Sequence, residues 1–263
     1  MNSSRIFAVF LRYMYLYKRS LPRLMEIFYW PFLDLLLWGF ITLYLAQSKK
    51  GLPNFVSFFL GALILWDILF RSQQGISVSF LEDVWSRNFL NLFVSPLTPG
   101  EYLVALMMVS SFKIILISTI ISVLAWIFYS FDIFLIGISL IPFILSLVIL
   151  GWSIGIATTS LILRFGQQAE ILAWGIAFLF QPVSAVFYPV AVLPKTLQMI
   201  ARVVPSSYVF EGMRKVINTQ TIPVRELAWS FGLNGIYMLL ALIFFHQMFK
   251  TVKKKGLLVR IGE

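Results

Sequence analysis

Long apolar stretches dominate this sequence and restrict it to a fold that is built in a lipid bilayer. Of its 263 residues, 60% are hydrophobic and 12% are charged, which is far more apolar than an average soluble domain. A helix needs about 20 apolar residues to cross the hydrocarbon core of a membrane. Runs of about this length recur at roughly 27–46, 53–70, 103–129, 133–163, 169–188 and 228–249. The sequence therefore predicts an all-α membrane protein with six transmembrane helices.

The remaining segments are too short to form a separate soluble domain, so we expect one transmembrane domain over residues 1–263. With the N-terminus in the cytoplasm, most of the 21 Lys and Arg residues fall in cytoplasmic segments. The positive-inside rule then places both termini in the cytoplasm and the protein in the cytoplasmic membrane. Basic residues beside anionic lipid head groups explain the net charge of +10, which requires no nucleic acid.

Enzyme and metal motifs do not explain this chain. It contains no G-x-x-x-x-G-K-[ST] loop with which to hydrolyse ATP. There are no cysteines, and the single histidine, His246, cannot build a zinc site alone. The sequence "GWSIG" at 151–155 fits the G-x-S-x-G motif of hydrolases, but it lies inside an apolar run instead of at a strand-to-helix turn. Its two glycines, four residues apart, predict a close contact between helices instead.

Residues 1–22 are patterned, although they do not form a span. Arg5, Arg12 and Arg19 recur every seven residues along one face of a helix, and apolar residues occupy another face. This pattern predicts an amphipathic helix in the membrane interface, ended by Pro22. The helix either anchors the chain on the lipid surface or also docks a cytoplasmic partner through its basic face.

The longest predicted cytoplasmic segment joins the second and third spans. Within it, residues 77–93 place apolar side chains at spacings of three and four, which predicts a short amphipathic helix. Its apolar side carries Leu81, Val84 and Trp85, and its polar side carries Glu82, Asp83 and Arg87. The next helix starts at a capping box of Thr98 and Glu101, with Pro99 in its first turn. The amphipathic helix either transmits force from a partner or rests on the membrane surface without one.

Between the fifth and sixth spans lies an apolar stretch, residues 189–217. It is broken by Pro189, Pro194 and Pro205. Two short helices can form on either side of the last proline, but neither is long enough to cross a bilayer. Glu211 precedes Arg214 and Lys215 by three and four residues, so these charges can pair along the helix. The stretch either lies at membrane depth, supported by other protein, or forms an amphipathic hairpin on the outer surface.

Three charged residues fall inside the first three predicted spans. Asp34, Asp67 and Lys113 lie in the inner half of the bilayer, counted along the first, second and third spans. An isolated charge at such a depth costs about 2.5–3.5 kcal/mol on insertion scales. We therefore expect Lys113 to pair with Asp34 or Asp67. The alternative is that each charge faces a hydrated central cavity.

Two segments, "SPLTPGEYL" (95–103) and "FYPVAVLP...VVPSSYVFEGMR" (187–214), are the most specific parts of this arrangement. With the order of spans and amphipathic helices, they resemble the membrane subunit of a type-2 ATP-binding-cassette (ABC) exporter over nearly the whole chain. The resemblance implies that 77–93 is a coupling helix seated in a separate ATPase subunit. It also implies that 189–217 forms re-entrant helices that close the outer end of the pathway, so that the prolines above, Glu211 and Arg214 belong to an outer gate.

The resemblance further implies a permease that exports a lipid, a lipophilic drug or another amphipathic substrate. ATP and Mg²⁺ would bind to the partner ATPase, and this chain would bind no cofactor. Six spans alone make a small pathway, so we expect a homodimer of membrane subunits, surrounded by membrane lipids.

Two alternatives remain open at this point. A lipid-linked polysaccharide is the other substrate class, but that branch tends to enter its first span with an "LG..W" pattern, whereas this chain has "LMEIFYWPFLDLLLWGF". This difference favours a lipid or a small amphipathic molecule. An intramembrane enzyme or a receptor belongs to a different class of function, and it would be active without an ATPase.

Overall fold

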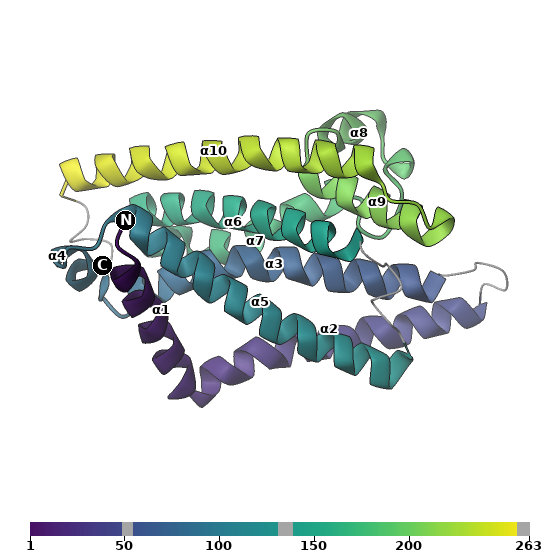
Figure 1. Ribbon diagram of the computed structural model, residues 1–263, viewed down its shortest axis with the longest axis horizontal. Coiled ribbons are helices and arrows are strands. Elements are labelled where there is room, and N and C mark those ends of the chain that lie inside the picture. Colours follow the sequence, from purple (N-terminus) through teal and green to yellow (C-terminus); the bar gives the residue numbers. More distant parts are fainter. Residues whose placement is uncertain (49–54, 131–138, 257–263) are drawn as a thin grey trace.

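The computed structural model describes residues 1–48, 55–130 and 139–256, and it folds these ranges into helices without a strand (Figure 1). The longest helices are α2 (Leu21–Ser48), α3 (Phe55–Trp85), α5 (Pro99–Tyr129), α6 (Leu140–Phe165) and α10 (Val224–Lys254). The shorter ones are α1 (Ser3–Lys18), α4 (Phe89–Val94), α7 (Glu170–Val183), α8 (Lys195–Ala201) and α9 (Pro205–Thr219), with 3-10 turns at Gly166–Ala169 and Val190–Val192. The predicted all-α fold class is confirmed.

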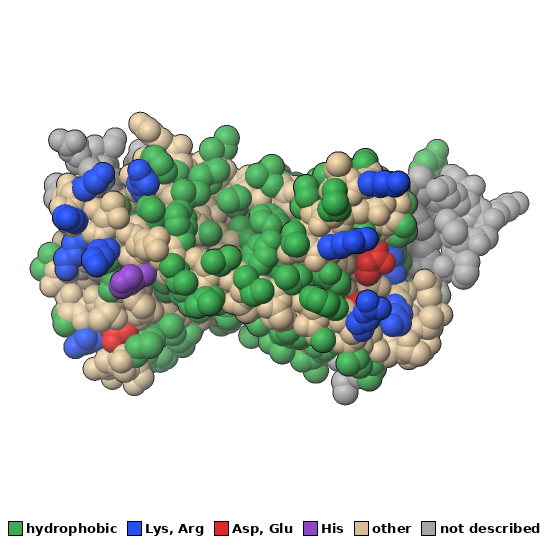
Figure 2. Space-filling view, turned by 90° about the horizontal axis from the view of Figure 1, so that it is seen from above, with side chains coloured by type: hydrophobic (Ala, Val, Ile, Leu, Met, Phe, Trp, Pro, Cys, Tyr) green, Lys and Arg blue, Asp and Glu red, His purple; other side chains and the backbone are tan. Residues whose placement is uncertain are grey.

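Four of the described helices, α2, α5, α6 and α10, are long and apolar enough to cross a membrane. The spans predicted at 53–70 and 169–188 correspond to α3 and α7, which are not among these four. Figure 2 shows hydrophobic side chains across the middle of one face and Lys and Arg side chains gathered toward its two ends. This distribution is the one expected of a multi-pass membrane protein, because lipid surrounds its middle and water its ends.

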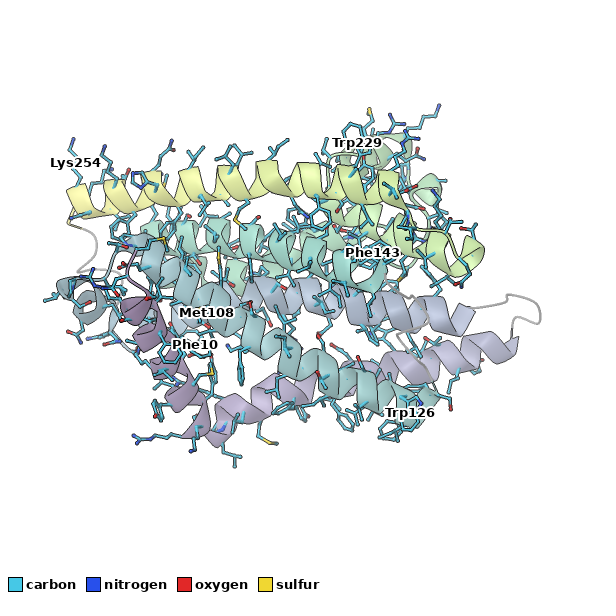
Figure 3. All side chains as sticks on the ribbon, viewed as in Figure 1. Phe10, Met108, Trp126, Phe143, Trp229 and Lys254 are labelled. Carbon is cyan, nitrogen blue, oxygen red and sulfur yellow. The ribbon has the colours of Figure 1, made fainter. Side chains whose placement is uncertain are left out.

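The long helices lie side by side along the longest axis of the molecule (Figure 1). α10 packs on α6, α6 on α3, and α3 on α5, while α2 contacts α3 and α5. α1 crosses this stack at a steep angle and packs on α5, near α4 and one end of α10. α8 and α9 cover the opposite end. In Figure 3, Lys254 and Trp229 mark these two ends along α10, which we call the α4 end and the α9 end.

α6 and α3 lie in close contact at the two glycines of "GWSIG". A Cβ atom added to Gly151 would lie 2.4 Å from the Cβ of Ser72 and 2.7 Å from the carbonyl oxygen of Leu69. One added to Gly155 would lie 2.8 Å from the carbonyl oxygen of Gln73. No larger residue fits without moving the helices apart. The predicted contact surface is confirmed.

The boundaries predicted for the helix over 77–93 are wrong. α3 continues without a break to Trp85, so the predicted second span and the first half of the amphipathic segment are one helix. It ends before Arg87, whose φ of 53° lies in the left-handed region, and α4 follows. The chain offers no proline inside α3, and Gly75 there lies against Ser110 of α5. Packing against α5 therefore extends a helix that the sequence pattern divided in two.

The amphipathic N-terminal helix is present as α1, but its end differs from the prediction. α1 stops at Lys18, and the backbone N–H of Arg19 caps it by donating to the carbonyl of Tyr15 at 3.1 Å. Pro22 lies in the first turn of α2. A proline is well tolerated there, because the first N–H groups of a helix have no partner within the helix. Pro22 therefore begins the next helix instead of ending this one.

Candidate functional site

A buried carboxylate, that of Asp83, joins three helices at the α4 end. Arg12 of α1 forms an ion pair with it, and the hydroxyl groups of Tyr13 and Tyr102 donate to it at 2.5 and 2.7 Å. Burial raises the pKa of the Tyr13 hydroxyl well above its ordinary value, with Tyr102 and Asp83 adding to the effect, so Tyr13 keeps its proton and remains a donor. These four residues, the Asp83 cluster, hold α1, α3 and α5 together.

This arrangement contradicts the docking face predicted for 77–93. Leu81 and Val84, the expected apolar anchors, are 0% and 1% exposed because they pack in the cluster of side chains shared with α1 and α5. Asp83, expected on a polar rim, is 1% exposed. Trp85 is the member of the predicted apolar side that remains accessible, at 43% exposed. Its indole N–H donates to the carboxylate of Glu170 in α7 at 3.3 Å.

The accessible part of the predicted segment is the end of α3, the turn after it and α4. We call Trp85, Arg87, Asn91 and Val94 the end surface, because all four are exposed at the α4 end. Val94 is 85% exposed although it is apolar. Such a residue at the tip of a membrane protein is available to contact another chain or a lipid head-group region.

The basic face of α1 contacts this chain itself. Arg5 donates to the carbonyl of Pro96 at 2.5 Å and lies 3.8 Å from the carboxylate of Glu101, while Arg12 pairs with Asp83. The predicted capping box is confirmed, since Glu101 accepts from the N–H of Thr98 at 2.9 Å and donates its own N–H to the Thr98 hydroxyl at 3.3 Å. Two of the three arginines at seven-residue spacing, Arg5 and Arg12, therefore form ion pairs inside this chain. The spacing alone did not distinguish such pairs from contacts with lipid or with a partner.

The predicted pairing of Lys113 with an aspartate is wrong. The ammonium nitrogen of Lys113 lies 3.4 Å from the hydroxyl of Ser79 and 4.3 Å from the centre of the Tyr17 ring. Asp67 pairs instead with Arg71, at 3.1 Å and one turn further along α3. A partner four residues away on the same helix is in reach without any alignment between helices, which favours this local pair.

Two pockets lie beside the Asp67 and Arg71 pair. The first, the basic pocket, has an empty volume of about 480 Å³ including its open mouth. It is lined by Tyr17, Arg23, Arg71, Gln74, Gly75, Val78, Glu82, Lys113, Ile117 and Trp174. The second, the acidic pocket, has about 440 Å³ and is lined by Pro31, Asp34, Leu35, Leu63, Ile64, Trp66, Asp67, Phe70, Ile121 and Phe178. The structure thus brings Asp34 and Asp67 to one pocket and places Lys113 in the other.

At the α9 end, the prolines of the broken apolar stretch each precede or begin a short element. Pro189 precedes the turn Val190–Val192, Pro194 precedes α8, and Pro205 is the first residue of α9. Proline suits these positions, because its fixed φ is compatible with the start of a helix. The N–H groups at a helix start have no partner within the helix, so no hydrogen bond is lost through the N–H that proline lacks. The two short helices predicted around Pro205 are confirmed as α8 and α9.

Arg214 of α9 holds the non-helical chain that follows α7. It donates to the carbonyl oxygens of Ala185, Val186 and Tyr188, the last two at 3.2 and 2.6 Å. The predicted pair with Glu211 is present at 3.1 Å, and Glu211 also accepts from the backbone N–H of Val190 at 2.7 Å. We call this arrangement the Arg214 site. Lys215, the other predicted partner of Glu211, pairs instead with Glu226 of α10 at 3.3 Å.

A comparison with known protein families matches residues 6–218 to the family described as ABC-2 type transporter. The matched region runs from α1 to α9, so it contains the Asp83 cluster, both pockets and the Arg214 site. The chain belongs to the ABC-2 type transporter family and is a membrane permease component of such a transporter. No curated protein matches the chain.

Proposed function

We propose that this chain is the transmembrane subunit of an exporter that moves a lipid, a lipophilic drug or another amphipathic molecule across the cytoplasmic membrane. ATP hydrolysis on a separate ATPase chain, which binds the ATP and Mg²⁺, drives the transport. The chain forms a single transmembrane domain with both termini in the cytoplasm, so the α4 end is the inner end. Membership of the ABC-2 type transporter family supports this proposal.

In this proposal six helices cross the membrane, namely α2, α3, α5, α6, α7 and α10. α3 has 31 residues and is therefore about 46 Å long, which exceeds the thickness of a bilayer core of about 30 Å. α7 has 14 residues, or about 21 Å, and the chain held by Arg214 continues it toward the α9 end. α8 and α9 then act as re-entrant helices of the outer gate. The exposed apolar residues Met199 of α8 and Val203 of the turn between the two helices support contact of this segment with lipid.

The observation that carries the proposal is the continuity of α3. This helix lines both pockets, through Arg71 and Asp67, and ends in the exposed Trp85 of the end surface. A partner that moves the end surface therefore also moves residues of the pockets. We propose that the ATPase binds the end surface, with Trp85 as its anchor, because large aromatic residues commonly supply most of the binding energy at an interface. A second copy of the chain completes the pathway.

Co-purification and ATPase assays with the Trp85→Ala variant test this proposal. The change should cost about 2 kcal/mol of docking energy, or about 30-fold in affinity for the ATPase, and it should abolish ATP hydrolysis stimulated by substrate. Trp229→Ala is the matched control, because Trp229 is 54% exposed at the opposite end. Equal ATPase binding and equal rates for wild type and Trp85→Ala, at matched protein concentration, would contradict the docking proposal. Failure of the wild-type chain to bring down any ATPase would contradict the exporter proposal itself.

A further inference from the structure

Lys113 holds a positive charge that the described part of the chain does not balance. Its ammonium group is partly buried in the basic pocket, where its contacts are the hydroxyl of Ser79 and the face of the Tyr17 ring. Among the residues that the structure describes, no carboxylate lies within ion-pair distance of it. A charge held in a membrane protein away from bulk water is normally paired. The ammonium group of Lys113 is therefore a site for a negative charge from outside the described chain.

The other charges around the basic pocket are already matched. Arg71 pairs with Asp67 at 3.1 Å, and Arg23 lies 3.9 Å from the carboxylate of Glu82. Within each pair the two charges neutralise one another. Neither pair therefore supplies a counter-charge for Lys113. The pocket as a whole keeps an excess of positive charge.

A second observation points to the same place. Tyr17 lines the basic pocket and is 7% exposed, yet its hydroxyl has no hydrogen-bond partner among the described residues. A buried polar group without a partner is rare, because no hydrogen bond offsets the free-energy cost of removing the group from water. The side chains of Lys113 and Tyr17 both line this pocket. An ammonium group and a hydroxyl can both donate hydrogen bonds, which suits an anion that offers several acceptor oxygens.

The remaining wall of the pocket is apolar. Val78, Ile117 and Trp174 come from α3, α5 and α7, and they line the pocket beside the polar groups. A free inorganic anion would leave this surface unused, whereas an acyl or other apolar chain would cover it and gain the free energy of apolar burial. The pocket therefore combines one polar corner with one apolar wall.

We propose that the basic pocket binds an anionic amphiphile, with a phosphate or carboxylate head group on Lys113 and Tyr17 and an apolar tail along Val78, Ile117 and Trp174. This proposal rests on the proposed export function and names the class of substrate that the pocket takes. Lys113 supplies the counter-charge, and the Tyr17 hydroxyl donates a hydrogen bond to a head-group oxygen.

Binding to the purified full-length chain in neutral detergent tests the proposal without any ATPase. The probes are dioctanoyl phosphatidate, dioctanoyl phosphatidylcholine and inorganic phosphate, each titrated while the thermal unfolding midpoint is measured. Phosphatidate should bind and raise the midpoint, since a ligand that binds the folded state stabilises it. Phosphatidylcholine, which has the same chains but no net negative charge, and phosphate, which has no chains, should each bind at least tenfold more weakly.

Two variants locate the site. Lys113→Gln should weaken phosphatidate binding at least tenfold, because it removes a charge-assisted hydrogen bond. Tyr17→Phe keeps the ring beside Lys113 and should weaken binding about threefold to tenfold through loss of the hydroxyl alone. Lys250→Gln, at an exposed lysine of α10, is the control for a general loss of positive charge and should bind as wild type does. If Lys113→Gln does not fold, Tyr17→Phe decides the test.

Three results would overturn the proposal. If phosphatidylcholine bound as tightly as phosphatidate, the negative charge would play no part in binding. If inorganic phosphate bound as tightly as phosphatidate, the apolar tail would play no part. Unchanged phosphatidate affinity in Tyr17→Phe and in any folded Lys113→Gln protein would place the ligand elsewhere. These results leave ATPase docking at Trp85 unaffected, so a failure here is distinguishable from a failure of the export function.

Discussion

The two ends of the molecule each use a partly buried arginine, but the two arginines meet different acceptors. At the α4 end, Arg12 pairs with the carboxylate of Asp83, which belongs to another helix. At the α9 end, Arg214 donates to carbonyl oxygens of a non-helical segment and pairs with Glu211 of its own helix. The first arrangement fixes helices relative to one another. The second satisfies backbone groups that have no helical partner.

This difference predicts different consequences of losing a partner. When a buried carboxylate is removed, the charge facing it remains in a poorly solvated place and the helices that it joined lose their connection. When an arginine that serves carbonyl groups is removed, the chain around those carbonyls can rearrange or take up water. Damage at the α4 end should therefore spread through the fold, and damage at the α9 end should remain local.

The largest effect is expected from Asp83→Ala. The change leaves Arg12 without its counter-charge and removes the carboxylate that accepts from the hydroxyl groups of Tyr13 and Tyr102, so the free energy of unfolding should fall by about 3 kcal/mol. Unfolding of the purified protein by dodecyl sulfate, followed by tryptophan fluorescence, measures this. Asp83→Asn keeps an acceptor and should lose less. Wild-type stability for Asp83→Ala would show that the cluster does not hold the helices.

Arg214→Met is expected to cost about 2 kcal/mol, because charged hydrogen bonds to carbonyl groups are lost. Hydrogen exchange should rise at residues 185–190 and remain unchanged in α1 and α5. Arg214→Lys keeps the charge but not the forked geometry, so its effect should be intermediate. The comparison between the ends breaks down if protection in α1 falls as much as protection at 185–190.

Gly151→Ala should reveal how independent the ends are, since the glycine lies where α6 meets α3 between them. The added methyl group has no room beside Ser72 and Leu69, and we expect a loss of about 1.5 kcal/mol. Gly232→Ala is the control, because nothing lies near its added Cβ in α10 and alanine favours the helix. Hydrogen exchange that rises at only one end in Gly151→Ala would show that the α3 and α6 contact does not join them.

The smallest effect is expected from Lys215→Gln. The ion pair of Lys215 with Glu226 lies at the same end as Arg214, but Lys215 is 45% exposed. Exposed pairs contribute little, so the free energy of unfolding should change by about 0.5 kcal/mol or less. A loss as large as that of Arg214→Met would mean that charge alone, and not the carbonyl contacts, stabilises the α9 end.

Local signals predicted much of this structure. Helix type, the capping box of Thr98, the glycine contact at Gly151 and the pair of Glu211 with Arg214 all depend on residues close in sequence or on one helix face. The local pair of Asp67 with Arg71 was also present in the sequence as a spacing of four. The sequence analysis instead paired Asp67 or Asp34 with Lys113, a residue of another helix.

The Asp83 cluster could not be predicted in the same way. A spacing of three and four indicates that one face of a helix is covered, but it does not say what covers it. Here α1 and α5 cover the face, because Arg12, Tyr13 and Tyr102 supply three partners for one carboxylate. Only the arrangement of the helices in space brings those residues together.

The unbroken course of α3 has a mechanical consequence. About 21 Å of helix separates Arg71 from Trp85, with no proline or left-handed residue between them to act as a hinge. A displacement at one end of such a rigid helix moves the other end too, because the whole helix tilts or shifts as one body. Suppose that a ligand beside Arg71 and a partner at Trp85 both favour one position of α3. Thermodynamic reciprocity then requires that each changes the affinity of the other by the same factor.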